Sequence, residues 1–585
     1  MTLLACGDDG SAADGETTAT TSTTAATGDN PSSDTASTAA DSTGADSTGA
    51  DSTSADSTSG GSMEESSTTA DTGADPLDDD SIARIHQAVQ DTLGTGFATG
   101  CSVAIWRDGA VIYAEGFGTK NEAGDAVTAD TLFQIGSDTK KMTAIALLRE
   151  VDAGTVDLDT TVTDLLPTLD LAASPGALDT LSIDRLLSHQ SGLYDYTPWD
   201  EAPDDAELEL RTSTVFAANE YAMMPAGVAW NYSNPNFSLA GLLTEHLAER
   251  PWAEVLIDDV AAPLDMTHTY ARRDDMLANE TDIASGFGPI INSDLDTFDL
   301  IELLSIEGSA PDWTSPEEHA DNAFTRPAGL VWATATDMAK LGGFLLAGDE
   351  AVLSDELREQ LLTGQVALGP GLDPTQIGYG YGVMTIRGFG GPQGYRDVPL
   401  VQHGGNTLDM TSTFVMLPEQ EVAVSILSNG SGDDMGLVAA VALEEAAAGR
   451  LPDPSNPPTP YDPPAEDLSV YAGTFFDSAL GEATITWTGA QLEIEIPLVT
   501  DLGAQVDPVL MPAFRDVFLV SVDGDQIDLS FYPDLDAVPH QYAVNRSFVF
   551  GRTEVDRPEP RRSRAGGRKP LAFTRSRPLA APRWR

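Results

Sequence analysis

The chain has 585 residues, too many for one ordinary domain, and 41% of them are hydrophobic, which is enough for a large core. Its 30 basic and 93 acidic residues give a net charge of −63, and such a surface repels nucleic acids and anionic membranes. The two cysteines, Cys6 and Cys101, are too few for a disulfide framework or a cysteine-based metal site.

The first residues contain a candidate lipidation site. Leu3-Leu4-Ala5-Cys6 is similar to a bacterial lipobox, in which the cysteine becomes the lipidated first residue of the mature chain, although no charged or long apolar segment precedes it. Either the natural start lies upstream of Met1, which we favour, or the match is accidental. The rest of 1–79 is rich in Ser, Thr, Ala, Asp and Gly and predicts a disordered tether. A lipid anchor followed by a tether is typical of a bacterial cell-envelope or secreted protein.

The segment 80–450 begins with a helix and a hairpin. Ser81 can cap a helix over 82–93, whose apolar residues recur at helical spacing. Two apolar segments, 102–106 and 110–116, are joined by an Asp-Gly pair, which favours a tight turn between antiparallel strands. The globular part of the chain is therefore expected to start near residue 80.

The central motif is Ser137-x-x-Lys140, which follows an apolar segment ending at Gly136 and opens a predicted helix at Ser137. Residues three apart share one face of a helix, so the hydroxyl and the amine would lie together. A serine hydroxyl needs a base beside it, and a lysine removed from water can serve because burial lowers its pKa. The helix N-terminus would add free N–H groups for a developing oxyanion. Taken alone, the motif is a weak signal, and a surface serine and lysine on a helix is the more usual interpretation.

Two later segments place polar side chains in turn-rich sequence. Tyr232 and Asn234 are separated by one residue, so an extended backbone directs both side chains the same way. A phenol and an amide facing one cleft can relay a proton and orient a substrate carbonyl, whereas the pair alone is a common surface turn. Residues 401–406, which include His403, predict a strand near an opening.

Strands and helices at both ends of 80–450, with helices in the middle, predict an antiparallel sheet with a helical cluster. Within this segment, Thr334 or Thr336 caps a helix predicted over 337–346, and a further helix is predicted over 437–448.

A proline-rich linker, 451–465, marks the clearest internal domain boundary. After it, two hairpins over 483–496 and 517–531 predict a small β domain assigned to 466–550. Residues 551–585 become basic and unpatterned, and they predict a disordered tail.

Three motifs in this order resemble those of the serine β-lactamase and penicillin-binding superfamily: Ser137-x-x-Lys140, Tyr232-x-Asn234 and His403-Gly404-Gly405. The second is similar to the branch that holds class C β-lactamases, D-alanyl-D-alanine carboxypeptidases and related esterases. The likeness covers about 80–449 and implies an α+β fold: an α/β/α sandwich whose antiparallel sheet is flanked by helices, with an all-helical subdomain. The C-terminal β domain is similar to barrel-like modules appended to hydrolases of this group.

The resemblance also implies a role for each matched residue. Ser137 would carry the acyl group, Lys140 would assist its deprotonation, and Tyr232 would protonate the leaving group and later activate water. Asn234 would hold the substrate amide, and the backbone N–H groups of Ser137 and Asn406 would bind the oxyanion.

Two departures from the family pattern concern the substrate-binding strand. His403 replaces the lysine that is frequent in the third motif, which keeps a donor near the site but weakens a fixed positive charge. Gly404, before Gly405, stands where many relatives have a threonine that binds the substrate carboxylate. This departure puts carboxylate recognition in question and leaves ester hydrolysis open.

We therefore predict a serine hydrolase that forms an acyl-serine on a peptidoglycan stem peptide, a β-lactam or a small ester, most like a D-alanyl-D-alanine carboxypeptidase or β-lactamase-related enzyme. The alternatives are an esterase of the same fold and a penicillin-binding sensor that acylates without turnover. The sequence has no G-x-S-x-G elbow, H-E-x-x-H zinc motif or P-loop, so we expect no metal or cofactor. A monomer is expected.

Overall fold

The computed structural model describes ten stretches of the chain, namely residues 75–289, 311–430, 432, 434–458, 468–478, 480–501, 503–522, 525–532, 541–546 and 548–553. The predicted lipidation site at Cys6, nearly all of the predicted tether and the predicted tail beyond residue 553 lie outside them. Within these stretches, no helix combines the length and apolarity needed to cross a lipid bilayer.

The centre of the fold is an eight-stranded antiparallel sheet in the order β2-β1-β13-β12-β11-β10-β9-β8. Its strands are β1 (Gly100–Arg107), β2 (Ala110–Gly118), β8 (Val366–Ala367), β9 (Ile377–Tyr379), β10 (Met384–Gly391), β11 (Gly394–Asn406), β12 (Thr411–Leu417) and β13 (Val422–Ser428). The first two strands form the predicted hairpin, and the last two lie beside them although they are some 300 residues away in the sequence. The chain thus closes its sheet by bringing both ends of the domain together.

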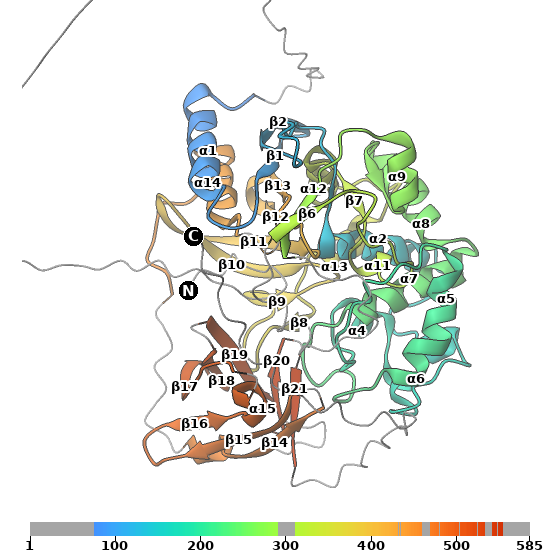
Figure 1. The fold of residues 1–585 in the computed structure, drawn as a ribbon, viewed down its shortest axis with the longest axis vertical. Coiled ribbons are helices and arrows are strands. Elements are labelled where there is room, and N and C mark those ends of the chain that lie inside the picture. Colours follow the sequence, from blue (N-terminus) through green and yellow to red (C-terminus); the bar gives the residue numbers. More distant parts are fainter. Residues whose placement is uncertain are drawn as a thin grey trace, which may run out of the picture. The chain divides into compact units, whose positions relative to one another are not determined.

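Helices cover both faces of this sheet (Figure 1). On one face lie α1 (Asp79–Thr92) and α14 (Gly436–Ala446), which pack on each other, and α14 also packs on β13. On the other face α12 (Ala335–Ala347) packs on β1 and β13. A separate apolar core lies on each face of the sheet, between the sheet and the helices. This arrangement confirms the predicted sandwich with helices on both sides of an antiparallel sheet.

Two predicted helix caps can be compared with the structure. The side chain of Thr334, and not that of Thr336, caps α12 by accepting the N–H of Asp337. The expected cap of α1 is wrong by one turn, because Asp78 is the capping residue and accepts the N–H of Ser81 at 2.7 Å. An Asp carboxylate at this position also interacts favourably with the positive end of the helix dipole.

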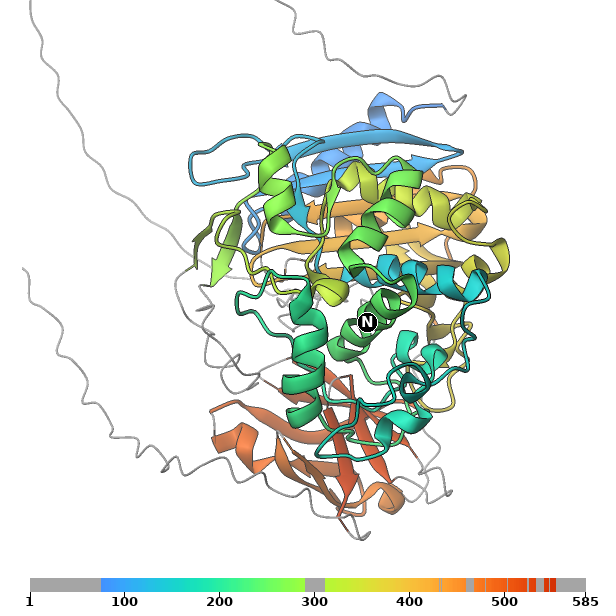
Figure 2. The ribbon, with the colours of Figure 1, turned by 90° about the vertical axis from the view of Figure 1, so that its right-hand side faces the viewer.

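The helical subdomain lies between α2 and α12 in the sequence, and Figure 2 looks onto its green helices in front of the sheet. Its helices are α2 (Thr139–Asp152), α3 (Val162–Leu165), α4 (Ile183–Leu187), α5 (Ala206–Arg211), α6 (Ala217–Asn219), α7 (Asn234–Ala248), α8 (Trp252–Val255), α9 (Arg273–Asn279) and α11 (Arg326–Gly329). The helix α7 packs on α2, α4, α8 and α11 and is the hub of this cluster. The structure thereby confirms the predicted helical subdomain.

The C-terminal β domain is a closed eight-stranded barrel with its own apolar core (Figure 1, orange to red). Its strands are β14 (Gly473–Asp477), β15 (Gly481–Trp487), β16 (Leu492–Glu495), β17 (Val506–Phe514), β18 (Val517–Val522), β19 (Asp525–Tyr532), β20 (Tyr542–Asn545) and β21 (Phe548–Arg552). Both predicted hairpins are confirmed, as β15 with β16 and as β18 with β19. Closure through β14 and β21 leaves no free sheet edge in the barrel.

Candidate active site

Ser137 lies in a sharp turn between a short strand and a buried helix. The turn is a single 3-10 turn, Gly136–Asp138, so α2 begins at Thr139, two residues later than predicted. Gly136 has a φ of +53°, and a Cβ added there would lie 2.6 Å from the backbone nitrogen of Asn406. Glycine is therefore required both by the left-handed backbone and by the close approach of β11. This turn presents the Ser137 hydroxyl at the end of α2.

Lys140 is fully buried one turn along from Ser137. Its Nζ atom donates hydrogen bonds to Ser137 Oγ at 2.9 Å, to Asn234 Oδ1 at 2.6 Å and to the backbone oxygen of Ala328 at 2.8 Å. The interpretation of Ser137-x-x-Lys140 as a surface pair is therefore wrong, because the amine points inward and contacts the hydroxyl.

Tyr232 and Asn234 both direct their side chains toward this pair, as their spacing predicts. The Tyr232 hydroxyl lies 2.8 Å from Ser137 Oγ, and the ring is fully buried. Asn234 is the first residue of α7, and its N–H donates to Asp195 Oδ1 at 2.7 Å, which fixes the start of the helix. Ser137 Oγ is therefore flanked by an amine and a phenol.

The strand β11 passes directly behind the nucleophile. A Cβ added to Gly405 would lie 2.1 Å from the backbone oxygen of Ile135 and 2.5 Å from the backbone nitrogen of Ser137, so no larger residue fits. The adjacent Gly404 is half-buried, and Asn406 ends the strand. The predicted oxyanion residues, Ser137 and Asn406, are thus brought together on neighbouring backbone segments.

His403 is buried in the same strand, but its hydrogen bonds lead away from Ser137. Its Nδ1 atom lies 2.6 Å from the backbone oxygen of Gly404, and its Nε2 atom lies 3.0 Å from the Tyr379 hydroxyl. Nδ1 must carry the hydrogen, since a carbonyl only accepts, and Nε2 then accepts from the tyrosine. Burial, followed by the charges of Lys141 and Lys140, holds the pKa of His403 well below its usual value. The imidazole is therefore neutral near pH 7.

Two residues that the sequence did not single out, Tyr379 and His189, place aromatic rings beside His403 and Tyr232. Tyr379 contacts His403 as described, and His189 packs on Tyr232 with ring centres 4.3 Å apart. His189 has a φ of +56°, and its Nδ1 atom accepts the N–H of Ser233 at 3.2 Å. No sequence motif marked His189, because a lone histidine in a loop carries no recognisable chemical signal.

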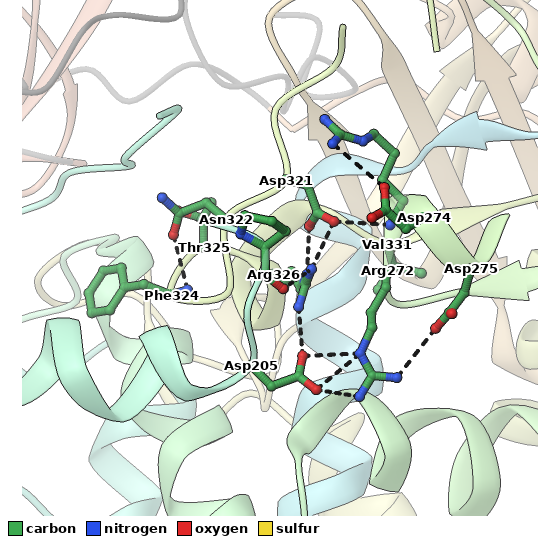
Figure 3. A network of polar contacts seen from close by, with 12 residues as sticks. Asp205, Arg272, Asp274, Asp275, Asp321, Asn322, Phe324, Thr325, Arg326 and Val331 are labelled. Atoms are coloured by element: carbon green, nitrogen blue, oxygen red, sulfur yellow. Dashed lines mark hydrogen bonds and ion pairs between the residues drawn. The ribbon is translucent and has the colours of Figure 1, made fainter. Parts of the chain in front are cut away.

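The carbonyl that binds Lys140 is positioned by a buried ion network (Figure 3). Arg326, the first residue of α11, is 2% exposed and donates to Asp321 at 2.6 and 2.8 Å and to Asp205 at 2.8 Å. Asp205 also accepts from Arg272 at 3.0 Å (Figure 3). Because α11 has only four residues, tertiary contacts such as these ion pairs and its packing on α2 and α7, rather than helix propensity, hold the Ala328 oxygen in place.

A second lysine, Lys141, lies beside the site but faces away from it. Its Nζ atom pairs with Asp138, both side chains are fully buried, and Asp138 also accepts the Ser412 hydroxyl at 2.6 Å. Burial lowers the pKa of Lys141 and raises that of Asp138, while each charge opposes the change in its partner. This pair joins the Ser137 turn to β12.

Comparison with known proteins gives matches over the whole catalytic segment. A family model described as Beta-lactamase matches residues 85–448. Protein flp of Staphylococcus aureus (strain N315) is 23% identical over 356 residues, and the match covers 60% of this chain and 64% of the length of that protein. Unguisins hydrolase ungD' of Aspergillus campestris (strain IBT 28561) is 25% identical over 493 residues, which are 78% of this chain and 86% of that protein.

Among solved structures, the crystal structure of SurE is similar in fold. It aligns with a TM-score of 0.60 at 20% identity, covering 81% of this chain and 98% of SurE. The aligned part is longer than the family-model match, so the fold likeness extends beyond the catalytic segment.

Proposed function

Because the chain belongs to the Beta-lactamase family, we propose that it is a serine hydrolase that cleaves amide, lactam or ester bonds through an acyl-serine, most like a D-alanyl-D-alanine carboxypeptidase. One observation carries the proposal: Ser137 Oγ lies 2.9 Å from Lys140 Nζ and 2.8 Å from the Tyr232 hydroxyl. A nucleophile within hydrogen-bonding distance of both a base and a proton donor is the arrangement that acyl transfer requires.

In the first half of the reaction, neutral Lys140 takes the proton of Ser137 as Oγ attacks the carbonyl carbon. The N–H groups of Ser137 and Asn406 stabilise the negative charge that develops on the carbonyl oxygen. Tyr232 passes a proton to the leaving amine or alcohol, and the acyl group stays on Ser137. In the second half, water activated by Tyr232 attacks the acyl carbon and restores the serine.

Ester hydrolysis is the second candidate, and a specific observation favours it. Gly404 has no side chain to bind a substrate carboxylate, and neutral His403 gives no fixed charge in place of the frequent lysine. An enzyme without these groups gains less from a carboxylate-bearing peptide than its relatives do. Leaving-group chemistry therefore separates the two candidates.

The direct test uses a fluorophosphonate and a fluorescent penicillin on the purified full-length chain. We expect covalent labelling in the wild type and none in Ser137→Ala, while the matched control Ser213→Ala, at an exposed serine, should be labelled normally. Turnover is then measured with a D-Ala-D-Ala peptide, a chromogenic cephalosporin and a short-chain p-nitrophenyl ester. Labelling with no turnover of any substrate would instead identify a penicillin-binding sensor, and no labelling would refute an acyl-serine mechanism.

A further inference from the structure

His189 occupies a position where many helices have a glycine. It follows Ser188, the C-cap of α4, its N–H donates to the backbone oxygen of Leu186 at 3.3 Å, and its φ is +56°. Helices commonly end on such a left-handed residue, which is usually glycine because a side chain strains this conformation. A fully buried histidine at this position indicates that the side chain itself is required there.

The residue forms hydrogen bonds on both sides of the catalytic tyrosine, Tyr232. Its backbone oxygen accepts the N–H of Asn231 at 2.9 Å, and its Nδ1 atom accepts the N–H of Ser233 at 3.2 Å. The Nδ2 atom of Asn236 lies 2.9 Å from the same Nδ1 and also donates to it. One residue, His189, therefore holds the chain immediately before and immediately after Tyr232.

The imidazole ring also packs on the phenol. Its centre lies 4.3 Å from the centre of the Tyr232 ring, with 34° between the two ring planes. The same imidazole lies 5.2 Å from the ring centre of Phe237 and 4.9 Å from that of Tyr379, and all four side chains are fully buried. On this side the phenol cannot tilt without displacing a buried ring.

The bonds to Nδ1 require a neutral imidazole. Because the backbone N–H of Ser233 can only donate, Nδ1 accepts and Nε2 carries the hydrogen. Burial, followed by electrostatic interactions with Lys140, His403 and Arg546, keeps the pKa of His189 well below its usual value. The hydrogen bonds on both sides of Tyr232 are therefore intact near pH 7.

The N–H of Tyr232 itself is bound by the C-terminal barrel. It donates at 2.7 Å to the backbone oxygen of Arg546, which lies in the turn between β20 and β21. The guanidinium carbon of this residue lies 4.3 Å from the centre of the Tyr232 ring. An apolar cluster that includes Met224, Tyr542 and Val549 docks the barrel here. Three consecutive backbone N–H groups are thus hydrogen-bonded around the catalytic tyrosine, and His189 accepts the two outer ones.

We propose that His189 is a positioning residue for Tyr232 and that it determines how fast the enzyme expels leaving groups that need a proton. This inference rests on the proposed function, in which Tyr232 protonates the leaving group. As Ser137 Oγ bonds to the acyl carbon, Lys140 takes the serine proton. The C–O or C–N bond then breaks, Tyr232 gives its proton to the leaving atom, and the proton held by Lys140 restores the tyrosine. A phenol displaced by about 1 Å would slow this transfer about 100-fold.

The test compares an ethyl ester with a p-nitrophenyl ester of the same short-chain acid on the full chain. Ethoxide needs a proton as it leaves, whereas p-nitrophenolate leaves as a stable anion, and kcat/KM reports only the steps through acylation. His189→Gly keeps the left-handed backbone and the oxygen that accepts the Asn231 N–H, but it removes Nδ1 and the ring. We expect its kcat/KM to fall about 100-fold for the ethyl ester and much less for the p-nitrophenyl ester.

Two further variants complete the comparison. His189→Asn, whose Oδ1 atom can accept the Ser233 N–H, should restore part of the ethyl-ester rate. His246→Ala, at an exposed histidine of α7, should change neither rate. A fluorophosphonate, whose fluoride leaves without a proton, should label His189→Gly at close to the wild-type rate, because Ser137 and Lys140 stay in place.

A wild-type rate on the ethyl ester in His189→Gly would overturn the proposal. So would an equal loss on both esters, or a rate in His189→Asn no higher than in His189→Gly. Crystal structures of the wild type and His189→Gly give a readout that needs no activity, since the Tyr232 hydroxyl should leave hydrogen-bonding distance of Ser137 Oγ in the variant. An unmoved hydroxyl would overturn the proposal, whereas a displaced one in a chain that hydrolyses no ester, amide or lactam would refute the proposed function alone.

Discussion

The side-chain oxygen of Asn234 accepts a hydrogen bond from Lys140 Nζ at 2.6 Å, while its Nδ2 atom donates to Thr197 Oγ1 at 2.9 Å. The amide is therefore oriented by Thr197, and its oxygen faces the amine. Two further acceptors of Lys140, the Ala328 backbone oxygen and the Ser137 hydroxyl, are uncharged as well. Uncharged acceptors stabilise an ammonium less than a carboxylate does, so each of these three bonds favours the charged lysine less than a carboxylate in the same place would.

Asn234→Asp tests this relationship directly. A carboxylate at the same position favours the charged form of Lys140 and raises its pKa, so neutral base becomes available only at higher pH. We expect the acidic limb of the kcat/KM profile to move to higher pH by about one unit or more. Asn234→Ala, the matched control, removes the acceptor without adding charge, so it should lower the rate without moving the limb to higher pH. An unmoved limb in Asn234→Asp would exclude Lys140 as the base.

Lys140→Arg should abolish acylation while the protein still folds. Arginine keeps a positive charge but does not lose its proton near neutrality, so it cannot accept the proton of Ser137. We expect the rate of fluorophosphonate labelling to fall by about 100-fold or more, as for loss of a general base. The control Lys340→Arg changes a partly exposed lysine of α12 that pairs with Asp337, and it should label at the wild-type rate. Normal labelling of Lys140→Arg would remove this lysine from the base role.

Local patterns explain which parts of the fold could be predicted from the sequence. The hairpin of β1 and β2 follows from two apolar segments on either side of an Asp-Gly turn, whose residues Asp108 and Gly109 have φ values of +53° and +92°. Ser137 and Lys140 are brought together by helical spacing alone, and Tyr232 and Asn234 by their separation of one residue. Each of these relationships needs only neighbours in the chain.

The missed features depend on contacts between distant segments. The family resemblance led us to expect a barrel, but periodicity does not specify that β14 pairs with β21 to close it. Arg546 approaches Tyr232 because an apolar interface docks the barrel, and no motif in the turn marks it. His403 was expected to keep a donor near the site, but its pairing with Tyr379 turns both ring nitrogens elsewhere. Burial, which a sequence motif does not report, decides the last two of these features.

Lys141→Met should destabilise the protein strongly, because it leaves the buried carboxylate of Asp138 without its partner. Removal of one member of a buried ion pair costs about 3–5 kcal/mol of unfolding free energy. Adding Asp138→Asn removes the charge and should recover much of that loss, since an amide oxygen can still accept the Ser412 hydroxyl. Urea unfolding of the single and double variants measures both steps. Arg387→Met, at the pair with Asp397 in which both side chains are exposed to solvent, should cost far less. Equal losses in the single and double variants would contradict an uncompensated charge.

His189→Asn should reduce the loss of stability at acid pH. The folded pKa of His189 is well below its ordinary 6.5, so the unfolded chain binds more protons below about pH 6.5 and the unfolding free energy falls with pH. The slope from one such histidine is at most about 1.4 kcal/mol per pH unit. Asparagine tolerates the φ of +56°, and its Oδ1 atom can replace Nδ1 as acceptor for the Ser233 N–H.

The measurement is urea unfolding of both proteins between pH 5 and 7. The unfolding free energies of the wild type and the variant should converge toward pH 5. The reason is that the variant has lost the pH dependence due to His189 and keeps that due to His403. Glu220, whose pKa burial raises well above its usual value, acts in the opposite direction, and its contribution cancels in the difference. Parallel curves would show that His189 takes up its proton without unfolding the chain.

Gly405→Ala should inactivate the enzyme through the backbone alone. A methyl group at this position would lie 2.1 Å from the oxygen of Ile135 and 2.5 Å from the nitrogen of Ser137, so β11 must move away from the nucleophile. Displacing one of two oxyanion donors lowers kcat by about 100- to 1000-fold, and KM should change much less. Gly390→Ala is the matched control, since nothing lies within 4 Å of a methyl group there and the residue is in the adjacent strand β10. Wild-type kcat in Gly405→Ala would mean that the oxyanion is bound elsewhere, whereas a loss in both variants would indicate general damage to the sheet.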